Sequence, residues 1–189
     1  GIDSMDPDEA GRVRVAEQID SARVVGVHDV EFLDHRDGMV EPGLPLRRDI
    51  ASAVRRHRPE LVVTLNHRER FGNGGQNMAD HRIVGQAVVD AVRDAANRWV
   101  FTDLLAAGLE PWDGVRYLAV LASPQPTHAV DVSDTIDAGI ESLRRHAAYL
   151  RGIGDPDPDA FLRGNAEATG ERRSEERRVG KECRSRWSP

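Results

Sequence analysis

The pattern of apolar and polar residues along the chain predicts helices that alternate with short strands. Apolar residues recur at helical spacing from Leu46 to His57 and again from Ala79 to Ala96. A β-branched run at Leu61–Leu65 separates these two helices, and another apolar run follows at Val115–Leu121. Strands that alternate with helices are typical of a doubly wound parallel sheet. The sequence therefore predicts an α/β fold with a Rossmann-like, mostly parallel sheet flanked by helices.

Further elements are expected on both sides of this central part. A helix begins near Asp6, where Pro7 suits a first turn, and ends near Val25. Short strands are expected at Val27–Leu33 and Ala129–Val132, and a last helix runs from a cap at Ser133 to about Leu150. The sheet obtained in this way lacks a first strand, and the chain does not begin with Met. We therefore expect an N-terminally truncated fragment.

The domain boundaries follow from changes in composition near the C-terminus. Residues 1–154 are expected to form one domain, and residues 155–172, which begin in a Gly/Asp/Pro stretch, are expected to be a linker. The segment 173–189 contains the only lysine and the only cysteine of the chain. It resembles the conceptual translation of a sequencing-library adapter, and we expect it to be an artefactual, disordered tail.

Composition excludes several classes of protein. The formal net charge of −6 disfavours nucleic-acid binding through phosphate contacts. No apolar run approaches the roughly 18–20 residues that cross a bilayer, and no signal peptide is visible. The single Cys183 cannot form an internal disulfide or a cysteine-based zinc site. A cytoplasmic protein with a small-molecule substrate, and with neither nucleic acid nor membrane as partner, is expected.

An acid and an imidazole lie at the end of the loop that follows the central strand. The strand at Leu61–Leu65 leads through a polar, Gly-rich loop to Asp80 and His81, which open the helix. Ligands of open α/β sheets bind at this edge, and a neutral imidazole is the commonest metal ligand. An acid at a helix N-terminus is also an ordinary cap that opposes the dipole. A site made by His67, His81 and His128 is possible, although no spacing favours it.

Two other positions carry possible substrate contacts. Asp37 follows the expected strand at Val27–Leu33, where a carboxylate can accept hydrogen bonds from paired sugar hydroxyls. In the ordinary alternative, Asp37 forms a turn before Gly38. Arg14 and Glu17 are three residues apart on the first helix and form at least a weak surface pair.

Over about residues 9–151 the chain resembles the LmbE-like, PIG-L family of zinc-dependent de-N-acetylases. The resemblance rests on the joint order of motifs that are individually short. They are Arg14-x-x-Glu17, Val25–Val27, Phe32–Gly38, Arg58–Thr64, Asp80-His81-Arg82, His128–Ser133 and His146.

The resemblance implies a Rossmann-like fold and hydrolysis of an acetamide on a sugar amine. Zinc in this family is held by a His and an Asp of an N-terminal His-Pro-Asp-Asp motif and by the last His of a His-Pro-Asp-His motif. His81 matches that last His, with Asp80 as its orienting neighbour in the catalytic centre. Asp37 and Arg14 match positions associated with substrate hydroxyls.

Two departures from the family pattern affect these expectations. The first motif, with two zinc ligands and the general base, is absent from the chain. Met78 stands where the second motif begins with a His that stabilises the oxyanion, and a thioether cannot donate a hydrogen bond. His67 is the expected substitute in substrate binding. We therefore expect this chain to bind zinc poorly and to be inactive.

The expected function of the intact protein is removal of an N-acetyl group from an amino-sugar conjugate or a related small amide, with zinc as cofactor. A homo-oligomer is possible. One alternative is a non-catalytic, Rossmann-like binding module whose site has degenerated at Met78. Another is an unrelated Rossmann-like domain, such as a nucleotide or sugar transferase.

Overall fold

The computed structural model describes residues 2–178, which form two compact units. Residues 32–127 make up one of them, here named the sheet unit. The other, here named the helical unit, consists of residues 2–31 together with residues 128–178. Within the described range, none of the helices combines the length and apolar character that a bilayer crossing requires.

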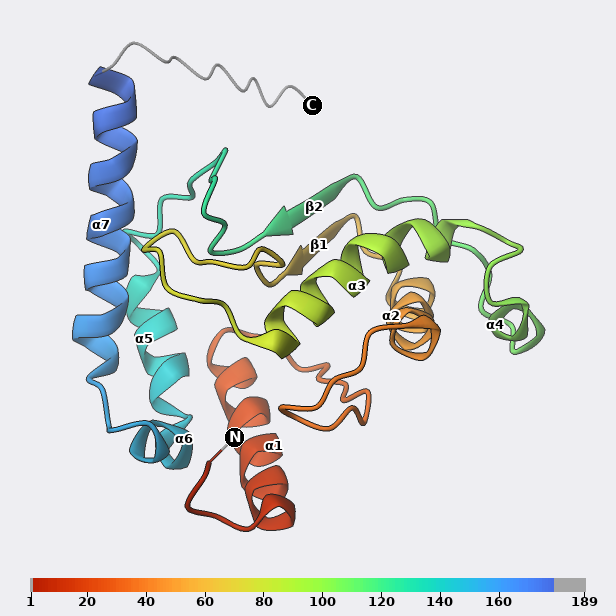
Figure 1. Ribbon diagram of the computed structural model, residues 1–189, viewed down its shortest axis with the longest axis horizontal. Helices are drawn as coiled ribbons and strands as arrows, with labels where there is room; N and C mark the ends of the chain where they lie inside the picture. The colour runs from red at the N-terminus through yellow and green to blue at the C-terminus, as the bar shows by residue number, and fades with distance from the viewer. Residues whose placement is uncertain (1, 179–189) are drawn as a thin grey trace. The chain divides into compact units, whose positions relative to one another are not determined.

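The sheet unit contains the parallel pair of strands that the sequence predicts. Its elements, in chain order, are α2 (Leu44–His57), β1 (Leu61–Thr64), α3 (Ala79–Ala96), α4 (Thr102–Ala106) and β2 (Tyr117–Val120). β1 and β2 lie side by side with Leu61 opposite Tyr117, as Figure 1 shows. A parallel pair needs a long crossover, and α3 and α4 supply it. The expected α/β class is thereby confirmed, with a two-stranded sheet among the described residues.

The core of the sheet unit lies between α2 and α3, which run next to each other in Figure 1. Small and branched side chains at helical spacing meet across this interface. Arg47 joins the two helices at its edge, because its Nε and Nη2 each donate to the Asp94 carboxylate at 2.8 Å. The buried members of the core are Leu46, Ile50, Ala51, Val54, Ala87, Ala91, Ala95 and Leu104.

Arg55 is buried at the C-terminal end of α3, with 2% of its surface exposed. Its guanidinium donates to five backbone carbonyl oxygens, those of Asp94, Ala95, Asn97, Val100 and Leu109. The last carbonyls of a helix lack partners within the helix and carry its negative dipole end. Arg55 satisfies two of these groups, on Asp94 and Ala95, and ties the end of α3 to the segment that follows it.

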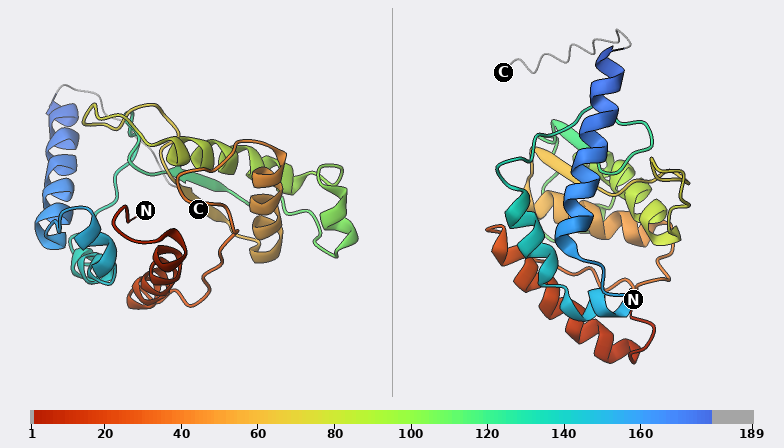
Figure 2. Two further views of the ribbon diagram at one scale, coloured as in Figure 1. Left: turned by 60° about the horizontal axis from the view of Figure 1, so that its bottom comes forward. Right: turned by 90° about the vertical axis from the view of Figure 1, so that its left-hand side faces the viewer.

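The helical unit consists of α1 (Pro7–Val24), α5 (Ile136–Arg144), α6 (Ala147–Gly152) and α7 (Pro158–Arg178). α5 packs against α1 and α7, and Figure 2 gives two further views of these helices. The hydroxyl oxygens of Ser21 and Ser142 are 2.7 Å apart where α1 meets α5. Glu17 on α1 accepts a hydrogen bond from the Ala148 amide at 2.5 Å and thereby covers the start of α6.

Several expected elements differ in the structure. Val27–Leu33 and Ala129–Val132 are irregular, because no strand of the described residues pairs with either segment. The last expected helix starts at Ile136 and is divided at Arg145–His146. Ser133 does not cap it, since the Asp131 carboxylate accepts hydrogen bonds from the Ser133 amide and hydroxyl and holds both in a turn.

A helix also replaces irregular chain near the C-terminus. α7 covers Pro158–Arg178, whereas the sequence predicts a linker over 155–172 and a disordered tail from 173. Asp157 caps the start of this helix by accepting hydrogen bonds from the Asp159 and Ala160 amides. The sequence analysis did not predict this helix, because the segment after Asp157 lacks apolar residues at helical spacing. The domain boundary at 154 stays a prediction, and residues 179–189 lie outside the described residues.

Candidate active site

The loop between β1 and α3, residues 65–78, is fixed by two asparagine side chains. Asn77 is almost fully buried, and its Nδ2 donates to the carbonyl oxygens of Asn66 at 2.6 Å and Arg68 at 2.9 Å. Its Oδ1 accepts from the Met78 amide at 2.9 Å. Asn66 in turn donates from Nδ2 to the Arg70 carbonyl oxygen. Buried amides whose hydrogen bonds are satisfied in this way have one preferred orientation. The loop therefore holds the start of α3 in a defined position.

α3 approaches this loop closely at Gly85. A Cβ atom at this position would lie 2.5 Å from the Leu65 carbonyl oxygen and 3.1 Å from the Cβ of His67. Residue 85 is four positions after His81, and side chains at this spacing lie one above the other on a helix. His67 and His81 therefore lie along the same face of α3, one turn apart.

His81 lies in the first turn of α3 and is partly exposed. The ring of Phe71, from the 65–78 loop, meets its imidazole edge-on with centroids 6.4 Å apart. No hydrogen bond among the described residues engages either ring nitrogen of His81, so both remain available to a ligand. The neighbouring His67 is partly buried, and its Nδ1 is enclosed without a hydrogen-bond partner.

Asp80 binds a distant stretch of backbone. Its Oδ2 accepts from the Gly38 amide at 2.6 Å, and its Oδ1 accepts from the Val40 amide at 3.3 Å. Both oxygens of the carboxylate are thus engaged with residues about 40 positions earlier in the chain. Among the described residues, no hydrogen bond joins Asp80 to the His81 ring. The role of Asp80 in orienting that ring therefore stays a prediction.

Asp37 immediately precedes the first of these amides and is exposed. Gly38 has φ of +80°, a conformation that favours glycine, and it turns its N–H toward Asp80. On the other side of Asp37, the ring of His35 is 3.1 Å from the Asp49 carboxylate on α2. The structure therefore brings the segment of Asp37 to the start of α3, where Asp80 directly precedes His81.

Arg14, the remaining predicted site residue, lies in the helical unit. Its guanidinium stacks over the ring of Tyr149 with Cζ 4.0 Å from the centroid, and its buried Nε has no hydrogen-bond partner among the described residues. Within the same part of the chain, Glu17 Oε2 and His146 Nδ1 are also buried without a hydrogen-bond partner. Burial, aided by Arg14 and opposed by Glu17, lowers the pKa of His146 from its usual value. The other predicted residues, Asp37, His67, Asp80 and His81, all lie in the sheet unit.

The described residues do not complete a zinc site. Among residues 2–171, whose side chains are described, His, Cys, Asp and Glu form no group of three or more that could hold a metal ion. A catalytic zinc takes three protein ligands and keeps a position for water. His81 offers an unengaged imidazole, but Asp80 is committed to backbone amides, and His128 is exposed in the other unit. The expected trio of His67, His81 and His128 therefore has no support from this geometry.

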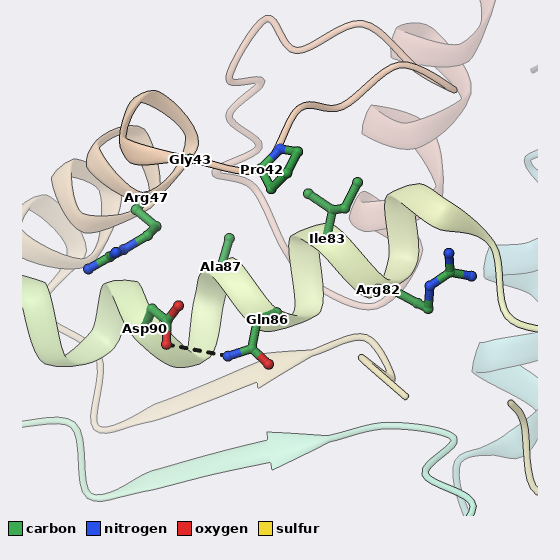
Figure 3. Close-up of a pocket in the computed structure, with 8 residues that line it drawn as sticks. All are labelled: Pro42, Gly43, Arg47, Arg82, Ile83, Gln86, Ala87 and Asp90. Carbon is green, nitrogen blue, oxygen red and sulfur yellow. Dashed lines mark hydrogen bonds between the residues drawn. The ribbon is translucent and has the colours of Figure 1, made fainter. Parts of the chain in front are cut away.

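A shallow groove of about 240 Å³ runs between the start of α2 and α3, and Figure 3 shows its lining. Gln86 and Asp90 form a hydrogen bond along one wall, at 3.3 Å. Arg47, at its base, is already paired with Asp94. The groove contains none of the predicted site residues. Its lining is Pro42, Gly43, Arg47, Arg82, Ile83, Gln86, Ala87 and Asp90.

Comparison with known proteins agrees with the motif order. The family model described as PIG-L, GlcNAc-PI de-N-acetylase, matches residues 1–92. Residues 1–92 of the chain are thus similar to a PIG-L family domain. This match includes Arg14, Asp37 and the start of α3 with Asp80 and His81.

A curated relative of the chain is named as a deacetylase. A diacetylchitobiose deacetylase of Thermococcus kodakarensis is 26% identical over 137 residues, which cover 72% of this chain and 49% of that protein. The chain therefore spans about half the length of this curated relative.

Two solved structures share the fold of this chain. One is the N,N′-diacetylchitobiose deacetylase from Pyrococcus horikoshii in complex with its inhibitor MPG. It has a TM-score of 0.77 and 23% identity, and the match covers 90% of this chain and 62% of that one. The other is a conserved protein of Thermus thermophilus, with a TM-score of 0.63 and 22% identity, covering 89% and 68% of the two chains.

The residues that shape the candidate site include some that sequence reasoning missed. Asn77 and Gly85 position α3, but neither carries a motif by itself. A signal for Asn77 was its place just before the predicted helix, where a polar residue often satisfies backbone groups. No local signal marks Gly85, because glycine is needed there only for its contact with the preceding loop.

Proposed function

We propose that this protein is a zinc-dependent hydrolase that removes an N-acetyl group from an amino-sugar conjugate or a related small amide. One observation carries the proposal: the unengaged imidazole of His81 stands at the start of α3, where Asp80 holds the segment of Asp37. The PIG-L match over these residues and the deacetylase relative support the same reaction.

In this proposal His81 is one metal ligand, and Asp37 contacts a substrate hydroxyl. When bound, zinc supplies a Lewis acid that polarises the amide and acidifies water. His67 lies against the face of α3 that carries His81. It is proposed to contact the substrate in place of Met78, whose thioether cannot donate a hydrogen bond. Arg14 is proposed as a further substrate contact. The described residues bring together no complete ligand set, so the chain is expected to hold zinc weakly and to be inactive.

The proposed surroundings of the protein follow from its composition. We propose a cytoplasmic protein that acts on a small N-acetyl-amino sugar. Because the chain has a net charge of −6, nucleic acid is not a proposed partner. A membrane is not a proposed partner either. A homo-oligomer remains part of the proposal.

The metal proposal is tested by titrating the chain with Zn²⁺ while the histidine ring resonances are followed by NMR. The His81 ring is expected to respond first, and His81→Ala is expected to remove this response. Zinc measured after dialysis is expected to be well below one ion per chain. A response confined to other histidines would overturn the role of His81, and stoichiometric zinc would overturn the expectation of weak binding.

A second candidate function is a non-catalytic binding module. Met78 favours it, because its side chain is exposed at the N-cap of α3 and makes no capping hydrogen bond. Incubation with N,N′-diacetylchitobiose and excess Zn²⁺, followed by an assay for free amine, separates the two. Amine release that His81→Ala abolishes supports the hydrolase. Sugar binding that needs neither Zn²⁺ nor His81 supports the binding module.

A further inference from the structure

The tip of the 65–78 loop carries an asparagine that is followed by glycine. Asn73 and Gly74 are both exposed, and nothing lies within 4 Å of the place where a Gly74 side chain would begin. Gly74 has φ of +84°, a conformation that glycine adopts without strain. The peptide bond between the two residues is therefore open on its outer side. None of the other asparagines of the chain precedes a glycine, and they are Asn66, Asn77, Asn97 and Asn165.

The side chain of Asn73 is folded back along this peptide. Its Oδ1 accepts from the Gly75 amide at 3.0 Å, which is the turn that asparagine forms with the backbone two residues on. Its Cγ lies 3.9 Å from the point where a Gly75 side chain would begin. The turn holds Cγ of Asn73 close to the backbone nitrogen of Gly74, and a bond between these two atoms closes a five-membered ring. Such proximity lowers the barrier to ring closure.

Two further contacts act on the Gly74 nitrogen. Arg70 donates from Nη1 to the Gly74 carbonyl oxygen at 2.9 Å, so a positive charge lies beside this peptide and favours loss of a proton from the neighbouring nitrogen. The Gly74 amide itself donates to the Phe71 carbonyl oxygen at 2.9 Å, and this bond opens before the nitrogen can react. Opening costs little at an exposed loop tip.

We propose that Asn73 is a self-modification site, at which the chain converts its own asparagine into aspartate and isoaspartate. The Gly74 nitrogen loses its proton and bonds to Cγ of Asn73, and the side-chain nitrogen takes up a proton and leaves as ammonia. Water then adds to one of the two carbonyl carbons of the ring and breaks the bond from that carbon to the Gly74 nitrogen, which regains a proton. One water is consumed and one ammonia released, and nothing is oxidised or reduced.

The modification acts on the surroundings of His81 through Phe71. The Phe71 amide donates to the Gly75 carbonyl oxygen at 2.8 Å, and its carbonyl oxygen accepts from Gly74, so both backbone groups of Phe71 are bonded across residue 73. Isoaspartate lengthens the main chain by one carbon at that residue, and the two bonds cannot both keep their geometry. The Phe71 ring, which meets the His81 imidazole edge-on, then loses its support. Neither step depends on the proposed function.

The site is tested by holding the whole chain in mildly alkaline buffer and following each asparagine by peptide mapping and mass spectrometry. Asn97 is the matched internal control, because it is exposed and its Oδ1 accepts from the Trp99 amide in the same kind of turn, but Arg98 follows it. Conversion is expected to be at least about tenfold slower at Asn97, and at Asn73 in Gly74→Ala, because a Cβ on the attacking residue hinders ring closure. Equal rates at Asn73 and Asn97, or an unmodified Asn73, would overturn the proposal.

The effect on His81 is tested on the same samples by NMR of its ring resonances. The fraction that carries isoaspartate is expected to show shifted His81 resonances, because the ring of Phe71 no longer meets the imidazole. Asn73→Asp gives the other product with an ordinary main chain and is expected to keep the parent resonances. Asn73→Ala, held in the same buffer, is expected to show no change with time. Unshifted His81 resonances in the isoaspartate form would overturn the link through Phe71.

Discussion

His67 packs against Gly85, one turn along α3 from His81. The Cβ of His67 is 3.1 Å from the point where a side chain of residue 85 would begin, and the Leu65 carbonyl oxygen is 2.5 Å from that point. The loop that leaves β1 and the helix that carries His81 are therefore in contact through a residue without a side chain. The place of His81 relative to the sheet depends on this contact.

Gly85→Ala is expected to destabilise the protein by about 2 kcal/mol, because the added methyl group meets backbone that cannot move aside. This loss outweighs the gain of about 1 kcal/mol that alanine brings to a helix interior. Urea denaturation measures the change. Gly11→Ala on α1 is the matched control, since nothing lies within 4 Å of its Cβ position, and it is expected to stabilise the chain. Stabilisation by both substitutions would contradict the close contact.

Asn77→Ala is expected to lower the free energy of unfolding by about 2–3 kcal/mol, since it leaves the Asn66 and Arg68 carbonyl oxygens without a donor. Asn77→Asp keeps the shape but cannot donate, so a similar loss is expected. Asn73→Ala, which removes one exposed contact in the same loop, is expected to stay within about 0.5 kcal/mol of the parent. Equal effects at both positions would argue against the buried amide as the support of the loop.

Arg55→Lys is expected to destabilise the protein by about 3 kcal/mol although the charge is kept. A lysine ammonium has three donors and cannot reach the five carbonyl oxygens that the guanidinium binds. Thermal unfolding followed by circular dichroism gives the change. Arg56→Lys, at the exposed neighbouring position, is expected to be nearly neutral, and a neutral Arg55→Lys would show that the carbonyl contacts contribute little.

His146 is expected to make stability depend on pH below its ordinary pKa of 6.5. Burial lowers the pKa of His146 in the folded chain, with a further contribution from Arg14 and an opposing one from Glu17. In the window between the folded and unfolded pKa values the unfolded chain binds more protons. Stability is therefore full above pH 6.5 and falls as the pH drops through this window.

The comparison that isolates His146 is the pH profile of the free energy of unfolding for the parent and His146→Gln. Glutamine does not titrate, so its profile is expected to be flatter below pH 6.5. Arg14, which stacks on the ring of Tyr149, and Glu17 are present in both proteins. Parallel profiles for the two proteins would contradict the lowered pKa.

The sequence by itself determined the elements whose information is local. The spacing of apolar residues gave α3 as Ala79–Ala96 without error, and the β-branched run gave β1. Each pattern repeats within a single helix or strand, so it can be recognised without knowing what that element packs against. The order of short motifs also led to the PIG-L family, because motif order survives where single residues have changed.

Only the tertiary structure decided what the chemical residues contact. Whether Val27–Leu33 becomes a strand depends on a partner strand, and the segment is irregular without one. Asp80 looked like a cap or an orienting neighbour of His81, yet it binds backbone about 40 residues away. The same carboxylate fits all three roles, and the choice among them lies in long-range contacts that no local pattern encodes.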